Sequence, residues 1–290
     1  MTPPLTNWRS RLRGDPAAWL LDHADNPSVY FWFQRDVVGR PEDAAALVRA
    51  RELILFSAPV QALFAAQNAS GYWDNPNALD VPRYRATLWQ LALLAELGIP
   101  RNSRRARSAC EFILQNFLRD DGELVGLTDE AAAGLLLRTL VYFNGHDDPR
   151  LLRAIDALAT RVPAYTPGAA VFAVWTLADL VNHHPTSKAL EALAQGEEII
   201  LDALARGAFS TLGAFPSFDE TDALLALRVL AQRRRAGDPR ASGVIEKIWE
   251  KQEENARWSL DKTLNEIVRL DANDASKWAT LNVLRIVTKT

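Results

Sequence analysis

The chain has 290 residues, of which 48% are hydrophobic and 24% charged, and its formal net charge is −3. This composition predicts a globular protein with a large core, and the slightly negative charge excludes a general basic surface for nucleic acid or anionic lipid. The single cysteine, Cys110, excludes an intrachain disulfide and is typical of a reducing compartment. Residues 1–16 lack the apolar region of a signal peptide, and no run of residues is apolar enough to span a bilayer. We therefore expect a cytoplasmic protein without a membrane span.

Residues 15–56 predict three short helices, of which the second, at 27–38, contains four consecutive aromatic residues. From residue 59 onward, two kinds of predicted helix alternate. One kind is amphipathic and ends in a polar residue, at 59–67, 103–115, 148–161, 187–206 and 238–252. The other kind is apolar on all sides and rich in small residues, at 83–97, 129–142, 167–181, 221–230 and 276–287. Strand signals are scarce, so the sequence predicts an all-α protein.

Several helix starts are marked by a capping residue followed by proline, which is favoured at the first helical position. This pair occurs at Asp15-Pro16, Asn26-Pro27, Asp148-Pro149, Thr166-Pro167 and Asp238-Pro239. Ser217 and Glu220 have the spacing of a capping box, which predicts a further helix start.

The amphipathic helices recur at a nearly constant interval. They end at Gln67, Gln115, Arg161, Arg206 and Gln252, which gives spacings of 48, 46, 45 and 46 residues. A period this even indicates a repeated helical hairpin. Because one helix of each hairpin is apolar all round and the other on one side only, we expect inner and outer layers of about five to six helices each. The sequence thus predicts a single domain over residues 1–290 with an α/α-toroid fold, closed by contact between 27–38 and 276–287.

Two segments carry a motif that resembles a known repeat. Residues 67–73, with the sequence QNASGYW, are similar to the QW motif of the squalene-hopene cyclase and protein prenyltransferase toroids, and residues 252–258 repeat the spacing as QEENARW. Residues 115–122 resemble a third copy without the tryptophan. We expect the glutamine to bond the backbone of the next unit and the tryptophan to pack over a helix end. The motif then acts as a staple that stabilises the fold.

The resemblance implies an activity of the terpene cyclase or prenyltransferase type, but the expected groups are incomplete. Terpene cyclases of this family donate a proton from the middle Asp of an Asp-x-Asp-Asp motif. The nearest segment here has Asp219 and Asp222 but Thr221 in the donor's place, and we take the two acids as candidate catalytic residues. They also fit a helix start, where the dipole favours acids. Prenyltransferases hold zinc with Asp, Cys and His, and Cys110 has no histidine near it in sequence. We expect neither a metal nor another cofactor.

The loops that lead into the apolar helices meet at one end of a toroid, and here they carry acids, cations and aromatic residues. We expect a ligand pocket at that end. The candidate ligand-binding residues on these loops and on the inner wall are Trp32, Asp80, Arg83, Tyr84, Trp89, Asp129, Glu130, Trp175, Phe218, Lys277 and Trp278, with Asp271 and Asp274 close to them in the sequence. Aromatic residues on inner helices fill a core more often than they contact a ligand, so both roles stay open for them.

Two functions fit these observations. The first is the binding or conversion of an apolar, isoprenoid-like small molecule in a central cavity, and it predicts an aromatic-lined void with an acid of raised pKa. The second is a non-catalytic toroid that binds a protein or peptide partner, and it predicts a packed centre with function on the rim. We favour the first, with the family's usual proton donor and zinc ligands missing from the pattern.

Overall fold

The computed structural model describes residues 8–143, 148–264 and 275–290, and Asp271 and Asp274 lie outside these ranges. The described chain is mostly helical, which confirms the predicted class. Its α-helices are α1 Ala17–Leu20, α2 Pro27–Asp36, α3 Ala45–Phe56, α4 Ala58–Ala65, α5 Thr87–Leu97, α6 Arg104–Asn116, α7 Glu130–Phe143, α8 Pro149–Arg161, α9 Pro167–Leu180, α10 Ser187–Ala205, α11 Ala223–Gln232, α12 Ser242–Glu250 and α13 Lys277–Val287. Short 3-10 helices lie at Trp8–Arg11, Val162–Ala164, Pro239–Ala241 and Glu254–Ala256. The strands β1 Ala214–Phe215 and β2 Lys262–Thr263 pair in parallel.

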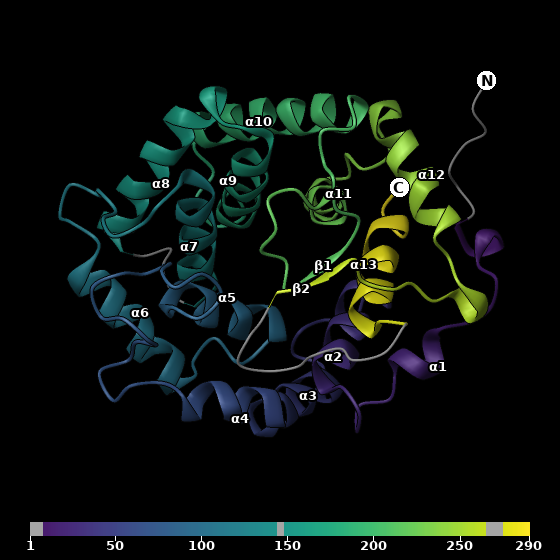
Figure 1. Ribbon diagram of the computed structural model, residues 1–290, viewed down its shortest axis with the longest axis horizontal. Helices are drawn as coiled ribbons and strands as arrows, with labels where there is room; N and C mark the ends of the chain where they lie inside the picture. The colour runs from purple at the N-terminus through teal and green to yellow at the C-terminus, as the bar shows by residue number, and fades with distance from the viewer. Residues whose placement is uncertain (1–7, 144–147, 265–274) are drawn as a thin grey trace.

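The helices from α4 onward form two layers. Figure 1 shows α4, α6, α8, α10 and α12 on the periphery and α5, α7, α9, α11 and α13 inside them. Every residue of α5 is buried, whereas α8 buries only a stripe spaced three and four residues apart, from Leu151 to Ala159. This difference confirms the predicted alternation of helices that are apolar all round with helices that are apolar on one face.

The inner helices pack against one another in chain order. α5 contacts α7, α7 contacts α9, α9 contacts α11, and α11 contacts α13. α13 then packs on α2, which is the contact between 27–38 and 276–287 that the sequence predicts. From α2, the indole nitrogen of Trp32 donates a hydrogen bond to the backbone oxygen of Glu96 in α5, at 2.7 Å. α2, near the start of the chain, is therefore joined both to α13 at its end and to α5.

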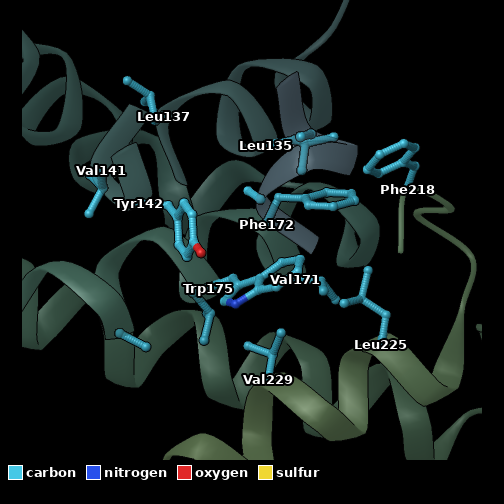
Figure 2. Close-up of a cluster of buried hydrophobic side chains, with 14 of the residues drawn as sticks. Leu135, Leu137, Val141, Tyr142, Val171, Phe172, Trp175, Phe218, Leu225 and Val229 are labelled. Carbon is cyan, nitrogen blue, oxygen red and sulfur yellow. The ribbon is translucent and has the colours of Figure 1, made fainter. Parts of the chain in front are cut away.

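Large apolar side chains fill the space between α7, α9 and α11. Leu135, Phe172, Trp175 and Phe218 point toward one another in Figure 2, and each is at least 98% buried. The helices approach closely because α7 carries Gly134, where an added Cβ would lie 2.8 Å from Cβ of Phe172. Thr176 of α9 also donates to the backbone oxygen of Gly134 at 2.9 Å. At this level the interior is a packed core.

Most of the predicted helix starts are confirmed. Asn26, Asp148, Thr166 and Asp238 each accept a hydrogen bond from a backbone N–H in the following turn, as a capping side chain does. Asp15 likewise accepts from the backbone N–H of Ala17 at 2.9 Å, although α1 begins one residue after the proline.

Two predicted boundaries are wrong. The helix predicted from Arg83 begins at Thr87, because Tyr84 has a φ of 62° and this left-handed conformation is incompatible with a continuous helix. α11 is capped by Asp222 and not by Ser217, whose hydroxyl donates instead to Glu96.

The tryptophans of the two motifs make equivalent contacts. The indole nitrogen of Trp73 donates to the backbone oxygen of Leu63 at 2.8 Å, and that of Trp258 donates to Ile248 at 2.7 Å, ten residues upstream in both cases. Gln67 donates to the backbone oxygen of Arg105 in α6 at 3.0 Å, which ties one hairpin to the next. The predicted role of the motif as a staple is confirmed at these contacts. In the ranges that the structure describes, no helix is long and apolar enough to cross a membrane.

Candidate functional site

The N-terminal ends of α5, α7, α9 and α11 lie close together, because Thr128 contacts Asp80 and Gly168 lies against Glu220, and most of the predicted site residues lie at these ends. Asp222 is buried at the start of α11. Its carboxylate accepts hydrogen bonds from the backbone N–H groups of Gly213, Ala214 and Leu224, at 2.8 to 2.9 Å. Burial outweighs these three bonds and raises the pKa of Asp222 to about 6. The carboxylate holds the loop that contains β1 against the start of α11.

Asp219 lies in the same loop and has polar partners on both oxygens. It accepts from the backbone N–H and hydroxyl of Thr221, and Lys262 of β2 donates to it at 2.8 Å. Burial works to raise the pKa of Asp219, but the hydrogen bonds from Lys262 and Thr221 prevail, and the net shift is downward. Asp219 and Asp222 are thus neighbours with opposite pKa shifts.

Asp80 is the third buried acid at this end. One of its oxygens accepts from the backbone N–H of Thr128, at 2.9 Å, and from the hydroxyl of the same residue. Its backbone oxygen accepts from the indole nitrogen of Trp89, at 2.8 Å. Asp80 therefore links the loop before α5 to the loop before α7.

Four of the predicted ligand-binding residues form one cluster. The rings of Tyr84 and Trp89 meet edge to face with centroids 5.2 Å apart, and the ring of Phe218 lies 5.6 Å from that of Trp89. The exposed guanidinium of Arg83 lies over Tyr84 and Trp89, at 5.3 and 5.4 Å from their centroids.

The other predicted residues at this end are dispersed. Trp278 stacks on Phe215 with centroids 3.9 Å apart, and Lys277 is paired with Asp25 at 2.8 Å. Asp129 caps the first turn of α7 by accepting from Ala132, and both Asp129 and Glu130 are exposed. Their roles toward a ligand stay predictions.

Trp32 and Trp175 lie elsewhere, in a pocket of about 250 Å³ that is lined mainly from the C-terminal ends of the inner helices. This pocket has six basic residues, namely Arg35, Arg138, Arg228, Arg233, Arg285 and Lys289. Its acids are Asp36, Glu96 and Asp179. Arg233 is also paired with Glu197 outside the pocket, at 3.2 Å. Arg35 is likewise paired with Glu42 outside the pocket, at 3.1 Å, so the remaining four cations face three carboxylates and the pocket stays electropositive.

Glu96 of α5 lies at the centre of the pocket floor. Both of its oxygens accept from the guanidinium of Arg228 in α11, at 3.2 Å each, and Ser217 also donates to it at 3.2 Å. The positive charges of Arg228 and Arg138 more than offset burial, so the pKa of Glu96 is lowered and it is a carboxylate at neutral pH. This bidentate pair joins helices that are 132 residues apart in the chain.

Arg138 of α7 is the least satisfied charge of the pocket. It is 94% buried, and its Nε and Nη1 atoms have no hydrogen-bond partner among the described residues. The nearest carboxylate oxygens belong to Glu96 and Asp179, both at 3.7 Å, beyond hydrogen-bonding distance. Its guanidinium lies over the ring of Trp175, 3.9 Å from the centroid, and that of Arg228 lies 4.6 Å from the same centroid. Burial lowers the pKa of Arg138.

Arg285 of α13 completes the floor from the far end of the chain. It pairs with Asp36 of α2 at 2.8 Å and donates to Asn282 at 3.0 Å, while its guanidinium lies over the ring of Trp32. Burial lowers the pKa of Arg285 to about 10, so it remains charged at neutral pH. Arg35 pairs with the other oxygen of Asp36 at the partly exposed rim.

The charged residues of this floor were missed in the sequence, although a signal is present. Arg138, Arg228 and Arg285 each follow a leucine in helices that are otherwise apolar all round, and Glu96 lies in a run of leucine and alanine. A charge in a wholly buried helix must find a partner or a ligand. That rule could have identified all four as site residues.

Comparison with known proteins adds no relative to this geometry, because no family model, no curated protein and no solved structure matches the chain. In the part of the chain that the structure describes, no group of three or more His, Cys, Asp or Glu side chains could hold a metal ion. Function is therefore inferred from the chemistry of the two ends of the inner helices.

Proposed function

We propose that the chain is an α/α-toroid of the squalene-hopene cyclase and prenyltransferase kind, and that it binds a small anionic molecule in the arginine-lined pocket at the C-terminal ends of its inner helices. The closed order of packing from α5 through α13 to α2 supports the toroid, as do the two tryptophan staples. The excess of cations over carboxylates in the pocket supports an anionic ligand.

The main support for an anionic ligand comes from Arg138. A buried hydrogen-bond donor without a partner costs about 1–3 kcal/mol, and more if it is charged. Two nitrogens of Arg138 are in this position at the floor of an open pocket. A ligand oxygen would satisfy them and would also offset the mutual repulsion of Arg138, Arg228 and Arg285.

The size of the pocket restricts the ligand. Pockets for drug-sized molecules typically measure about 300–1,000 Å³, so 250 Å³ suits a compact anion. The guanidinium groups that lie over Trp32 and Trp175 occupy ring surface that could otherwise contact an apolar tail. An isoprenoid chain fits this pocket poorly.

The test is calorimetric titration of the purified chain with phosphate, sulfate, citrate and acetate at constant ionic strength. We expect the wild type to bind at least one of the multivalent anions and Arg138→Met to lose at least about tenfold in affinity, or 1.4 kcal/mol. Arg138→Met should still fold, because Glu96 keeps its bidentate pair with Arg228. Arg104→Met, at an exposed site on α6, is the control. Absence of binding by the wild type would refute the function, and wild-type affinity in Arg138→Met would refute the site.

A second candidate function places an apolar, isoprenoid-like ligand at the N-terminal ends of the inner helices. It is supported by the cluster of Tyr84, Trp89 and Phe218 beneath Arg83, and by the raised pKa of Asp222 nearby. Activity would be of the terpene cyclase or prenyltransferase type. The test is incubation with prenyl diphosphates and squalene, assayed for new products. Product formation that survives both Asp219→Asn and Asp222→Asn would show that these acids are not catalytic.

The alternative of a non-catalytic protein that binds a partner is supported by apolar side chains on the outer surface. Val48 and Phe56 of α3 are 47% and 77% exposed, and this apolar surface suits contact with a protein or peptide partner. A chain that binds neither anions nor prenyl compounds, and whose retention of partner proteins is lost in Phe56→Ser, would favour this function over the other two.

A further inference from the structure

The three carboxylates of the arginine-lined pocket differ in what they can still accept. Both oxygens of Glu96 are bonded to Arg228, and the two oxygens of Asp36 are paired with Arg35 and Arg285. Glu96 and Asp36 are therefore occupied as counterions of the arginines. They reduce the positive charge of the floor but offer little to an incoming ligand.

Asp179 differs from Glu96 and Asp36 because no cation among the described residues lies within hydrogen-bonding distance of its carboxylate. It lies near the C-terminal end of α9, at the rim of the pocket, with 34% of its side chain exposed. Its closest cation is Arg138, whose Nε is 3.7 Å from Oδ2, and neither carboxylate oxygen accepts a hydrogen bond from the residues that the structure describes. An anion bound to the free nitrogens of Arg138 would therefore lie beside a carboxylate that can still accept a hydrogen bond.

A carboxylate beside an anion site discriminates between anions by their protons. Sulfate at neutral pH has no proton, so a neighbouring carboxylate only repels it. A phosphate group that retains one proton donates its O–H to the carboxylate, which turns the repulsion into a charge-assisted hydrogen bond. Selectivity between ligands of the same shape often depends on such a repulsive element.

We infer that the ligand of this pocket is a phosphate group that carries one proton, bound through Arg138 and selected over sulfate by Asp179. The inference depends on the proposed anion site and goes further by naming the chemical class. The charge balance agrees with an anionic ligand, because Arg35 and Arg233 have further partners in Glu42 and Glu197 and the remaining four cations still outnumber the three carboxylates. The ligand is free phosphate, because a phosphate monoester loses its second proton at about pH 6 and then has none to donate to Asp179.

The experiment compares phosphate with sulfate by calorimetry at constant ionic strength and mildly alkaline pH. We expect the wild type to prefer phosphate by about tenfold or more, a difference of 1.4 kcal/mol. Asp179→Asn replaces the repelling carboxylate with an amide that can donate to sulfate, so its preference should fall at least about tenfold, mainly through tighter sulfate binding. Asp156→Asn, at an exposed site on α8, should behave as the wild type does.

The outcomes separate the two proposals. If no anion binds to the wild type, the anion pocket itself is wrong. If phosphate and sulfate bind equally well to the wild type, or if Asp179→Asn leaves their ratio unchanged, the pocket stands and the assignment to protonated phosphate is overturned. A titration with phenyl phosphate at the same pH tests the role of the proton, because this ester is fully deprotonated there: weaker binding than inorganic phosphate supports the assignment, and equal or tighter binding overturns it.

Discussion

The two ends of the inner helices use buried charge in different ways. At the N-terminal ends, Asp80 and Asp222 lie in loops or at a helix start and accept hydrogen bonds from backbone N–H groups, although Oδ1 of Asp80 has no partner among the described residues. At the C-terminal ends, Glu96, Arg138 and Arg285 project from buried helices, and their partners are other side chains such as Arg228 and Asp36. Buried acids near loops therefore indicate contacts that stabilise the fold, whereas buried charges within helices indicate a candidate site for a ligand.

The comparison teaches that a carboxylate at the predicted entrance of a ligand pocket is weak evidence for a catalytic role. A helix start attracts acids because its free N–H groups and dipole favour them, with or without a substrate. A guanidinium in the middle of a buried helix has no such local reason, and it is costly unless something pairs with it. The stronger functional evidence in this chain is thus Arg138, and the predictions below test the difference between the two ends.

The largest effect is expected for Glu96→Gln at the C-terminal ends. Removing the carboxylate charge leaves Arg228 and Arg138 buried without their shared counterion, which should lower the free energy of unfolding by about 3–5 kcal/mol. Urea denaturation measures the loss. Glu191→Gln, on the exposed face of α10, should change stability by no more than about 0.5 kcal/mol.

Phosphate should restore part of the stability that Glu96→Gln loses, because a bound anion replaces the missing negative charge. A loss below about 1 kcal/mol would mean that the arginines are well solvated, and the contrast between the two ends would then disappear.

A smaller, pH-dependent effect is expected for Asp222 at the N-terminal ends. Its pKa in the folded chain is about 6, against an ordinary value of 3.8, so between these values the folded state holds a proton that the unfolded chain has released. The contribution of Asp222 is fully present below about pH 4 and is lost as the pH rises through about 6, by at most about 3 kcal/mol. The wild type should therefore lose stability over this window relative to Asp222→Asn, which has no such titration.

Denaturation of both proteins at several pH values measures this difference. If the wild type instead gains stability on the variant as the pH rises, the three backbone hydrogen bonds outweigh burial, and Asp222 is a plain capping carboxylate.

The architecture was more predictable than the pocket, for reasons visible in single elements. The all-round apolar character of α5 and α9 and the caps at Asn26 and Thr166 are local signals, so the sequence indicates them directly. The pair β1 and β2 has only two residues per strand and no periodicity to detect. The pocket depends on contacts such as Glu96 with Arg228, which are created by packing between distant helices. No local pattern reveals such a partner.

The smallest effect is expected in the tryptophan staples, where one motif position differs between the two copies. Gly71 has a φ of 98°, and Ala256, at the same position of the second copy, has a φ of 56°. A left-handed conformation costs a residue with a side chain about 1–2 kcal/mol, while glycine adopts it freely but loses more entropy on folding. Ala256→Gly should therefore raise the free energy of unfolding by up to about 1 kcal/mol and leave phosphate binding unchanged. The reverse change, Gly71→Ala, should destabilise the chain more strongly, because the added Cβ would lie 2.5 Å from the backbone oxygen of Ser108. If Ala256→Gly altered phosphate affinity, the two ends of the inner helices would be coupled, and the division between a structural end and a binding end would not hold.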